Sequence, residues 1–414
     1  MNSQDSIYRT YNVSPVINAA GTKTRIGGSR IRPEAIDAME RAAESFVVLS
    51  ELQSAASERI SELTGAQAGY VTAGASAGLL LSAAAAIAGD DFEVMAELPA
   101  TKGVADEIIM PRTHRTAYDH AFTAAGATIV DVGTNDVELG TGAATVEPWE
   151  LRGAITEQTA AIGYVEKSYT QPPLAVVTEI AHEHDIPVIV DAAAEIPPVE
   201  NFERFIDAGA DLVVFSGGKA IRGPQTTGIV AGRSDLIESI ALQNLDMHIA
   251  REIWDAPAII DSVALEDGVP RHGIGRSAKV GKEELAGLLA ALESFVTEDQ
   301  DAVYETWMAR STYFDQQLGG LEGIETAIDT SGESRAPVVE MSLDPAVIGQ
   351  NATEIAADLR SQDPRLFVGS DRLTEDMIVL NPMCLTDEEV EYVLERLLEA
   401  ITPQSTSSFE PFTE

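Results

Sequence analysis

Three features of the sequence predict an α/β protein that has a mostly parallel sheet in a large domain, followed by a smaller α+β domain. The chain has 414 residues, which at roughly 150 residues per domain suggests two or three domains. From about residue 51, apolar strand-like segments alternate with helical segments, which is typical of a layered α/β domain. The strand cores at 186–190 and 212–215 are continuous and apolar, which indicates strands covered on both faces.

The chain begins with an arm and a first helix, which we assign to residues 1–45. Gly21, Gly27 and Gly28 interrupt the first 32 residues, and Pro33 suits the first position of a helix at 33–45. The alternation then predicts a large domain at 46–270. Its elements, in order, are helix 51–64, strand 68–72, helix 76–88, strand 106–110, helix 118–125, strand 127–132, strand 159–165, helix 174–184, strand 187–191, helix 201–208 and strand 211–215.

After Gly275 the pattern changes, and we assign residues 271–402 to a smaller α+β domain. The polar residues 403–414 are expected to form a mobile tail. The elements of the smaller domain are helices 282–297 and 301–318, strand 336–342, helix 352–361, strands 366–369 and 377–380, and helix 386–400.

The composition is strongly acidic. The 67 acids and 27 bases give a net charge of −40, a sign that repels nucleic-acid backbones and anionic membranes. The acids are spread along the chain, and there are only six lysines. This distribution favours a halophilic protein, soluble at high salt where screening reduces self-repulsion, over an acidic ligand-binding patch.

Other features of the sequence predict a soluble cytoplasmic protein. Cys384 is the single cysteine, so an internal disulfide is impossible. The N-terminus has neither a cationic start nor an apolar signal core, and the longest apolar stretch, 75–88, is too short to span a bilayer.

The most informative site lies at the ends of two neighbouring apolar strands. One strand ends in Asp191, and the other continues through Ser216, Gly217 and Gly218 to Lys219. Ligands of open α/β sheets bind beyond the carboxyl ends of the strands, so one crevice receives a carboxylate and an amine. A lysine shielded from water can act as a nucleophile and form a Schiff base with an aldehyde cofactor. The alternative is a surface lysine in a strand-to-helix loop beside a solvated aspartate.

The segment Thr72-Ala-Gly74-Ala-Ser76-Ala-Gly78 lies between a strand and an apolar helix. Its small residues allow close approach to the backbone, and the N–H groups at the start of the helix can bind an anion such as phosphate. The segment lacks the Gly-x-x-x-x-Gly-Lys pattern of nucleoside triphosphatases. Together with Asp191 and Lys219 it suggests pyridoxal 5'-phosphate (PLP), which needs an anion site, a carboxylate and a lysine. Tight helix packing is the alternative explanation.

These motifs resemble those of the fold-type I PLP-dependent superfamily. Within it, the sequence is similar to the selenocysteine synthase (SelA)-like branch and its D-glucosaminate-6-phosphate ammonia-lyase group. The resemblance implies the fold-type I transferase fold with a seven-stranded type of sheet. The segments that carry it are 18–29, 114–119, 167–168, 191–195, 216–224 and 279–283.

The resemblance also implies roles for individual residues. Lys219 would bind the cofactor aldehyde, and Asp191 would pair with the pyridinium nitrogen; these two are the expected catalytic residues. His114 would cover one face of the cofactor with Tyr118 behind it, unless it is a capping or surface histidine. The other expected cofactor contacts are Gly74, Ala75, Ser76, Ala193 and Ser216.

The expected substrate is a small anionic amino acid or amino-sugar acid, bound by Arg115, Lys167 and Ser168. The competing interpretation gives Arg115 a neighbouring acid as its partner, and Lys167 a salt bridge to Glu166 or Glu195. Residues 169–173 differ from the pattern of the ammonia-lyase group, so a phosphosugar substrate stays open.

The implied activity is a PLP-dependent lyase that releases ammonia and works as a homo-oligomer. A class V-like aminotransferase and a SelA-like seryl-tRNA selenium transferase are the alternatives. The tRNA substrate is disfavoured because the chain is acidic and lacks the N-terminal domain that the bacterial selenium transferase uses for tRNA.

Two classes without PLP were also considered. Gly74 to Gly78 matches the letters of the Gly-x-Ser-x-Gly elbow, so a serine hydrolase with Ser76 and either His248 or His272 is a rival. A cofactor-free binding protein is the other. No His-Glu-x-x-His or paired-cysteine motif predicts a metal site, and the rings of His182 and His184 are expected to face apart.

Overall fold

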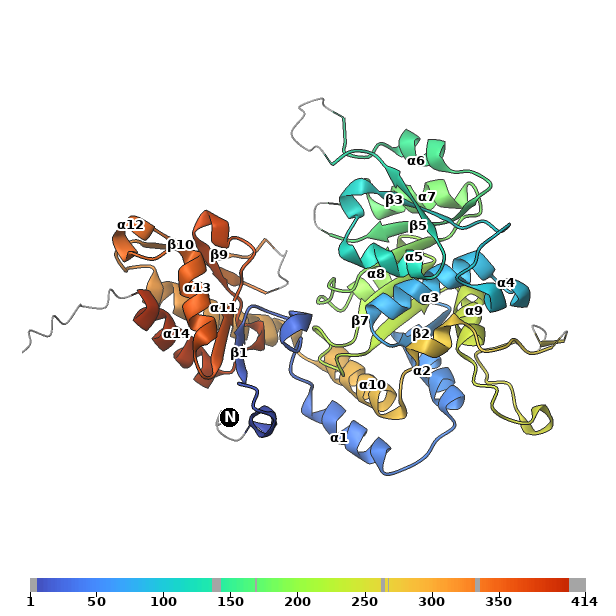
Figure 1. Cartoon of the computed structure of the whole chain (residues 1–414), viewed down its shortest axis with the longest axis horizontal. Helices are drawn as coiled ribbons and strands as arrows, with labels where there is room; N and C mark the ends of the chain where they lie inside the picture. Colours follow the sequence, from blue (N-terminus) through green and yellow to red (C-terminus); the bar gives the residue numbers. More distant parts are fainter. Residues whose placement is uncertain are drawn as a thin grey trace, which may run out of the picture. The chain divides into compact units, whose positions relative to one another are not determined.

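The computed structural model describes residues 6–135, 143–167, 170–261, 265–266, 268–331 and 336–401. The chain forms two compact units (Figure 1). The larger is Ile31–Glu298, and the smaller joins the residues up to Arg30 with those from Asp299 onward. The expected tail at 403–414 lies outside the described residues.

The larger unit is built on a seven-stranded sheet in the order β2-β8-β7-β6-β5-β3-β4. Strands β3 to β7 run parallel, and β8 pairs antiparallel with both β2 and β7. The predicted α/β fold with a mostly parallel seven-stranded sheet is therefore confirmed. The strands are β2 (Ala68–Thr72), β3 (Glu107–Pro111), β4 (Thr128–Val132), β5 (Thr159–Val165), β6 (Val188–Asp191), β7 (Leu212–Ser216) and β8 (Gly228–Gly232).

Helices cover both faces of this sheet. Successive strand residues point to opposite sides, so a continuous apolar strand places apolar side chains on both faces. Val213 and Phe215 belong to one core, whereas Leu212 and Val214 belong to the other. The first core is closed by α1 (Pro33–Ala43), α2 (Leu49–Thr64), α6 (Pro148–Ala154), α7 (Leu174–His182), α8 (Asn201–Asp207) and α10 (Lys282–Thr297). The second is closed by α3 (Ala75–Ala88), α4 (Phe92–Glu97), α5 (His120–Ala124) and α9 (Ser234–Asn244).

The smaller unit has its own core and two small sheets. An antiparallel sheet has the order β12-β10-β9, and β1 pairs parallel with β11. The strands are β1 (Val16–Ala19), β9 (Ile324–Asp329), β10 (Val338–Leu343), β11 (Arg365–Val368) and β12 (Met377–Leu380). The helices are α11 (Gln300–Leu318), α12 (Pro345–Ile348), α13 (Ala352–Ser361) and α14 (Asp387–Ile401).

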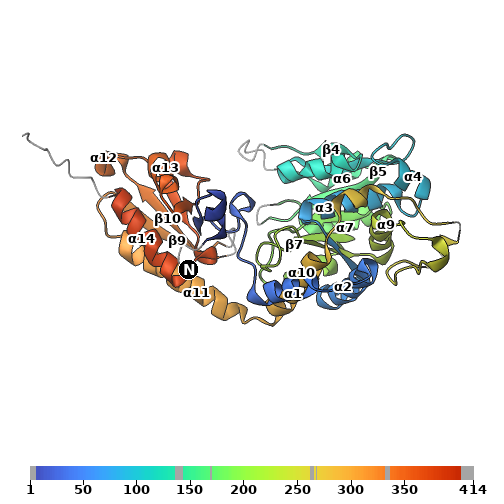
Figure 2. The same ribbon diagram turned by 60° about the horizontal axis from the view of Figure 1, so that its bottom comes forward.

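The unit boundaries differ from the predicted ones at both ends of the large domain. The N-terminal arm belongs with the C-terminal unit, because Val16 to Ala19 form a strand registered with Arg365 to Val368. Helix α10 belongs to the larger unit, because its Leu288, Leu292 and Phe295 are buried in the first core. In both Figure 1 and Figure 2, α10 lies beside α1 and α2.

Two elements near the site were missed by the sequence analysis, which predicted no element between residues 216 and 281. This interval contains β8 and α9. Strand β8 is short and begins and ends with glycine, so its pattern also fits a loop. Among the described residues, the helices are all too short or too polar to cross a membrane.

Candidate active site

The candidate site is built at the carboxyl edge of the parallel strands. Val165, the last residue of β5, is registered with Asp191 of β6, and Asp191 is registered with Val214 of β7. At the end of β7, Ser216 pairs with Gly228 of the antiparallel β8. Gly228 also pairs with Thr72, the last residue of β2. The structure therefore brings the ends of β2, β5, β6 and β7 to one edge of the sheet.

The turn that carries Lys219 requires glycine at two positions. A Cβ on Gly217 would lie 2.2 Å from Thr227 Oγ1, and a Cβ on Gly218 would lie 2.6 Å from the Gln225 Cα. The turn is closed by the Gly217 N–H, which donates to the Thr227 carbonyl at 2.9 Å. Lys219 therefore follows β7 on a backbone whose path is fixed by packing.

Arg32 fastens the same loop, a role that the sequence analysis missed. Its backbone N–H donates to the Arg222 carbonyl, and its Nε donates to the Ile221 carbonyl, both at 2.9 Å. The guanidinium also binds both oxygens of Glu298, at 3.0 and 2.6 Å. Arg32 is only 6% exposed, so these charge-assisted bonds lie in a dry environment and hold the residues after Lys219 in place.

The expected anion cradle begins at Gly74. This residue has φ 88° and ψ 163°, a conformation essentially restricted to glycine. It allows β2 to turn directly into α3, whose first N–H groups have no partner within the helix. The backbone of Gly228 packs directly against the cradle. A Cβ on Gly228 would lie 2.5 Å from the Gly74 carbonyl carbon and 2.6 Å from the Ala75 nitrogen. Among the described residues, apart from its two chain neighbours, no atom lies within 4 Å of a Cβ built on Gly74. The cradle is therefore open on the side to which that Cβ would point.

Asp191 is the last residue of β6. The Ala193 N–H donates a hydrogen bond to Asp191 Oδ1, at 3.1 Å. Burial raises the pKa of Asp191, while the Ala193 hydrogen bond and the charges of Lys219 and Lys167 oppose that rise. The carboxylate of Asp191 thus interacts electrostatically with the side chain of Lys219.

Lys167 is paired with a buried acid, as one of the two sequence interpretations proposed. Its Nζ lies 2.8 Å from Glu195 Oε1, and the Glu195 side chain is 3% exposed. Glu166, the other predicted partner, binds Arg204 at 2.9 Å. The Lys167 side chain remains 36% exposed, so it can still contact a ligand. Ser168, its expected neighbour in substrate binding, lies outside the described residues.

The position of His114 does not support the expected role of covering the cofactor. The residue has no exposed surface, so in this conformation neither ring face can meet a ligand. Its Nε2 bonds to the Gln171 carbonyl at 3.1 Å, its Nδ1 accepts from the Val165 N–H at 3.4 Å, and the ring packs edge-on against Tyr164. Burial lowers the pKa of His114 to about 4, so the imidazole is neutral at neutral pH. Tyr118, expected behind it, is 53% exposed.

Arg115 follows the interpretation that gave it acidic neighbours. It binds Asp131 at 2.6 Å and also contacts Asp119.

The serine-hydrolase alternative needs a histidine beside Ser76. Within the described part of the chain, no hydrogen bond joins Ser76 to a histidine, and His248 and His272 cluster with Asp246 instead. The geometry thus gives the serine-hydrolase alternative no support.

The chain is similar to known proteins over most of its length. Residues 16–251 match the family model described as SelA, L-seryl-tRNA selenium transferase. The chain is 30% identical to a D-glucosaminate-6-phosphate ammonia lyase of Salmonella typhimurium, over 95% of this chain and 97% of that protein. It is 31% identical to a 5'-C-glycyluridine monooxygenase-decarboxylase of a Streptomyces species, over 95% of this chain and 92% of that protein.

Similarity to solved structures extends along the chain as well. A solved structure of D-glucosaminate-6-phosphate ammonia-lyase superposes with a TM-score of 0.78 at 28% identity, covering 97% of this chain and 99% of that one. A ureidoglycine–glyoxylate aminotransferase from Bacillus subtilis shares the fold, with a TM-score of 0.56 at 14% identity over 94% and 92% of the two chains. The chain therefore belongs to the SelA family and is an enzyme with the fold-type I architecture of PLP-dependent proteins.

Proposed function

We propose that the protein is a PLP-dependent lyase that releases ammonia from a small anionic amino acid or amino-sugar acid. The observation that carries the proposal is the meeting of Asp191 and Lys219 at one sheet edge, in a chain similar along nearly its whole length to an ammonia lyase. D-glucosaminate-6-phosphate is the first substrate to test.

The residues of the site fit PLP. The N–H groups of Gly74, Ala75 and Ser76, with the Ser216 hydroxyl, suit the phosphate, since a helix start binds anions. The Asp191 carboxylate suits the protonated ring nitrogen, and its Oδ1 is oriented by the Ala193 N–H. Lys219 suits the aldehyde carbon. When bound, PLP supplies an electron sink for negative charge that develops at the substrate α-carbon.

The side chains then divide the work of elimination among themselves. Lys219 takes the α-proton as general base, since a lysine amine can serve in this role once it is unprotonated. Asp191 keeps a negative charge close to the ring nitrogen, which stabilises the protonated form of that nitrogen. Lys167 binds the anionic group of the substrate, and Glu195 holds the lysine in place. Departure of the β-substituent, followed by hydrolysis, gives a keto acid and ammonia.

Turnover with one substrate tests the proposal. The protein is incubated with PLP and D-glucosaminate-6-phosphate, without an amino acceptor, and ammonia and keto acid are measured. We expect many equivalents of both per active site, and none from Lys219→Ala. An enzyme that stops after one turnover and restarts only with added keto acid is an aminotransferase, which would refute the lyase.

Oxidative decarboxylation is a second candidate, because the Streptomyces relative is as similar to this chain as the ammonia lyase is. The two reactions differ in whether they consume oxygen and release carbon dioxide. A lyase releases ammonia at the same rate with and without oxygen, whereas a monooxygenase-decarboxylase consumes oxygen and releases carbon dioxide. An oxygen electrode during the same incubation separates them.

The oligomeric state, the binding partners and the cellular location of the protein remain predictions. We propose a cytoplasmic homo-oligomer without a nucleic-acid partner. The net charge of −40 weighs against tRNA, because an acidic surface repels the nucleic-acid backbone. The acidic surface predicts an assembly that is more stable at high salt. Light scattering at low and multimolar salt tests both the oligomer and its salt dependence.

A further inference from the structure

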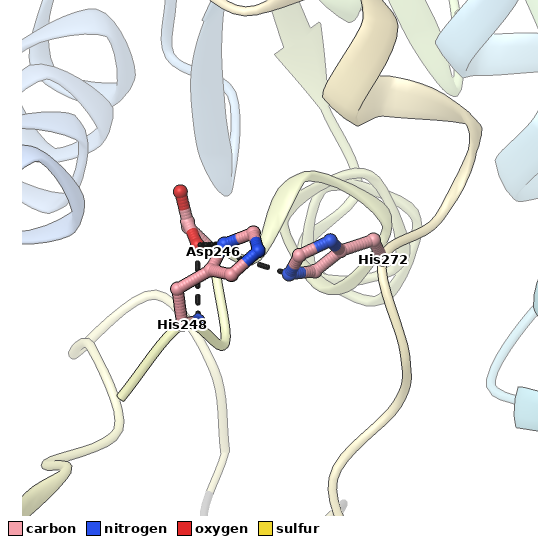
Figure 3. Close-up of side chains that lie close together, drawn as sticks. All are labelled: Asp246, His248 and His272. Carbon is pink, nitrogen blue, oxygen red and sulfur yellow. Dashed lines mark hydrogen bonds and ion pairs between the residues drawn. The ribbon is translucent and has the colours of Figure 1, made fainter. Parts of the chain in front are cut away.

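Two histidines and an aspartate that sequence motifs do not connect form a cluster on the larger unit. Asp246 and His248 follow the end of α9, and His272 lies 24 residues further on, just before the turn Ile274–Ala278. Figure 3 shows the three side chains facing one another. One ligand atom from each lies within 4.8 Å of the others, and all three residues are exposed.

The carboxylate of Asp246 is the centre of this cluster. Its Oδ1 lies 2.6 Å from His248 Nδ1 and 3.7 Å from His272 Nε2 (Figure 3). Its Oδ2 binds the Arg276 guanidinium at 2.7 Å. One oxygen is therefore held by an arginine outside the cluster, while the other faces both imidazoles. The His248 backbone N–H also donates to Oδ1, at 3.1 Å.

The Nε2 of His272 lies close both to Asp246 and to the backbone after α9. The Met247 N–H donates to this nitrogen at 3.1 Å, so Nε2 acts as an acceptor. The lone pair of Nε2 therefore points to the Met247 N–H, and a metal ion bound there would replace this hydrogen bond. The two rings are also close, with centroids 4.6 Å apart. Both rings are thus close enough to bind one ion together with Asp246.

We propose that Asp246, His248 and His272 bind a divalent transition-metal ion such as Zn²⁺. Two imidazoles and a carboxylate are donors that Zn²⁺ accepts, and a water molecule would complete a tetrahedral site. Arg276 would orient the carboxylate from outside, as groups behind metal ligands do. The ion would tie the chain after α9 to the chain before residue 274, which gives it a structural role.

The acidic surface makes the choice of ion important for the test. With a net charge of −40, the protein attracts any divalent cation, but Mg²⁺ prefers oxygen ligands and leaves imidazoles free. Zn²⁺ titrations are therefore made by calorimetry on the full-length protein in excess Mg²⁺, which occupies carboxylate-only sites. Co²⁺ added in a parallel titration reports tetrahedral nitrogen ligation through its visible absorption.

The variants His248→Ala and His272→Ala test the ligands, and His184→Ala is the matched control. His184 is exposed and lies outside the cluster. We expect one Zn²⁺ per chain for the parent and His184→Ala, and affinity at least about tenfold weaker in each cluster variant. We also expect Zn²⁺ to raise the unfolding temperature of the parent and the control alone. Equal binding by all four proteins, or none above the Mg²⁺ background, would overturn the site and leave a hydrogen-bonded cluster only.

Discussion

Replacing Gly228 with alanine places a methyl group against the backbone of the expected phosphate cradle. The new Cβ would lie 2.5 Å from the Gly74 carbonyl carbon and 2.6 Å from the Ala75 nitrogen, where ordinary contacts are 3.4–4 Å. Gly228 cannot move away, because it is paired with Thr72 on one side and Ser216 on the other. The turn at Gly74 must therefore shift by about 1 Å, and overpacking of this kind typically costs about 1–3 kcal/mol.

That cost should appear mainly as weaker cofactor binding. The empty cradle can relax around the methyl group, whereas a cradle that holds a phosphate must keep its N–H groups aligned. A penalty of about 1–3 kcal/mol corresponds to roughly 5- to 150-fold weaker affinity for PLP. The assay is a titration of the cofactor-free protein with PLP, followed by the absorbance of the bound cofactor.

Gly153→Ala is the control for the same chemical change. Gly153 lies in the short helix α6, and no atom lies within 4 Å of a Cβ built there. This variant should bind PLP like the parent and be equally or slightly more stable, since alanine favours helix. A Gly228→Ala protein that binds PLP within twofold of the parent would refute the argument that Gly228 supports the cradle.

Three further predictions test neighbouring parts of the account. Asp191→Asn should keep the fold and bind PLP but lose activity by about a hundredfold, because an amide cannot stabilise the protonated ring nitrogen; activity within a few-fold of the parent in the ammonia assay would contradict this. Arg32→Ala should lower the free energy of unfolding by about 1–3 kcal/mol in urea, since it leaves Glu298 and the Ile221 carbonyl without the Arg32 side chain as partner, whereas the exposed Arg41→Ala should change it by less than about 0.5 kcal/mol; equal effects would disprove the anchor. For His114, burial lowers the pKa from 6.5 in the unfolded chain to about 4, so the folded state binds fewer protons in this window and loses stability as the pH falls through it. His114→Gln should remove up to about 3 kcal/mol of that loss between pH 6.5 and 4, and an unchanged pH dependence of unfolding would show that His114 does not cause it.

Strands that are buried on both faces, and the residues that follow them, could be predicted from the sequence alone. The apolar runs before Asp191 and Lys219 have few structural alternatives, so both the strands and the approximate position of the two side chains follow from the pattern. The same holds for Gly74, which was predicted to lie between a strand and an apolar helix, as β2 and α3 show. The residue types of the candidate site can therefore be recognised from the sequence pattern.

Contacts between distant segments could not be predicted in this way. Arg32 binds backbone carbonyls 189 and 190 residues away, and a carbonyl carries no signal of residue type. The arm residues Val16 to Ala19 are too few to reveal that they pair with residues 365–368. The family resemblance implied that His114 covers a cofactor face, but the packing of Tyr164 and Gln171 encloses it. The His248–His272 cluster likewise depends on a loop that brings together residues 24 positions apart.

The central claim is that Lys219 carries PLP opposite Asp191, and one measurement tests it most directly. The protein is loaded with PLP and treated with borohydride, which reduces the bond between the cofactor aldehyde and its lysine to a stable amine. Peptide mapping by mass spectrometry then locates the label among the six lysines of the chain. We predict a single pyridoxyl group on Lys219, and none in Lys219→Ala. A label on Lys167 or Lys23, or no label at all, would contradict the account.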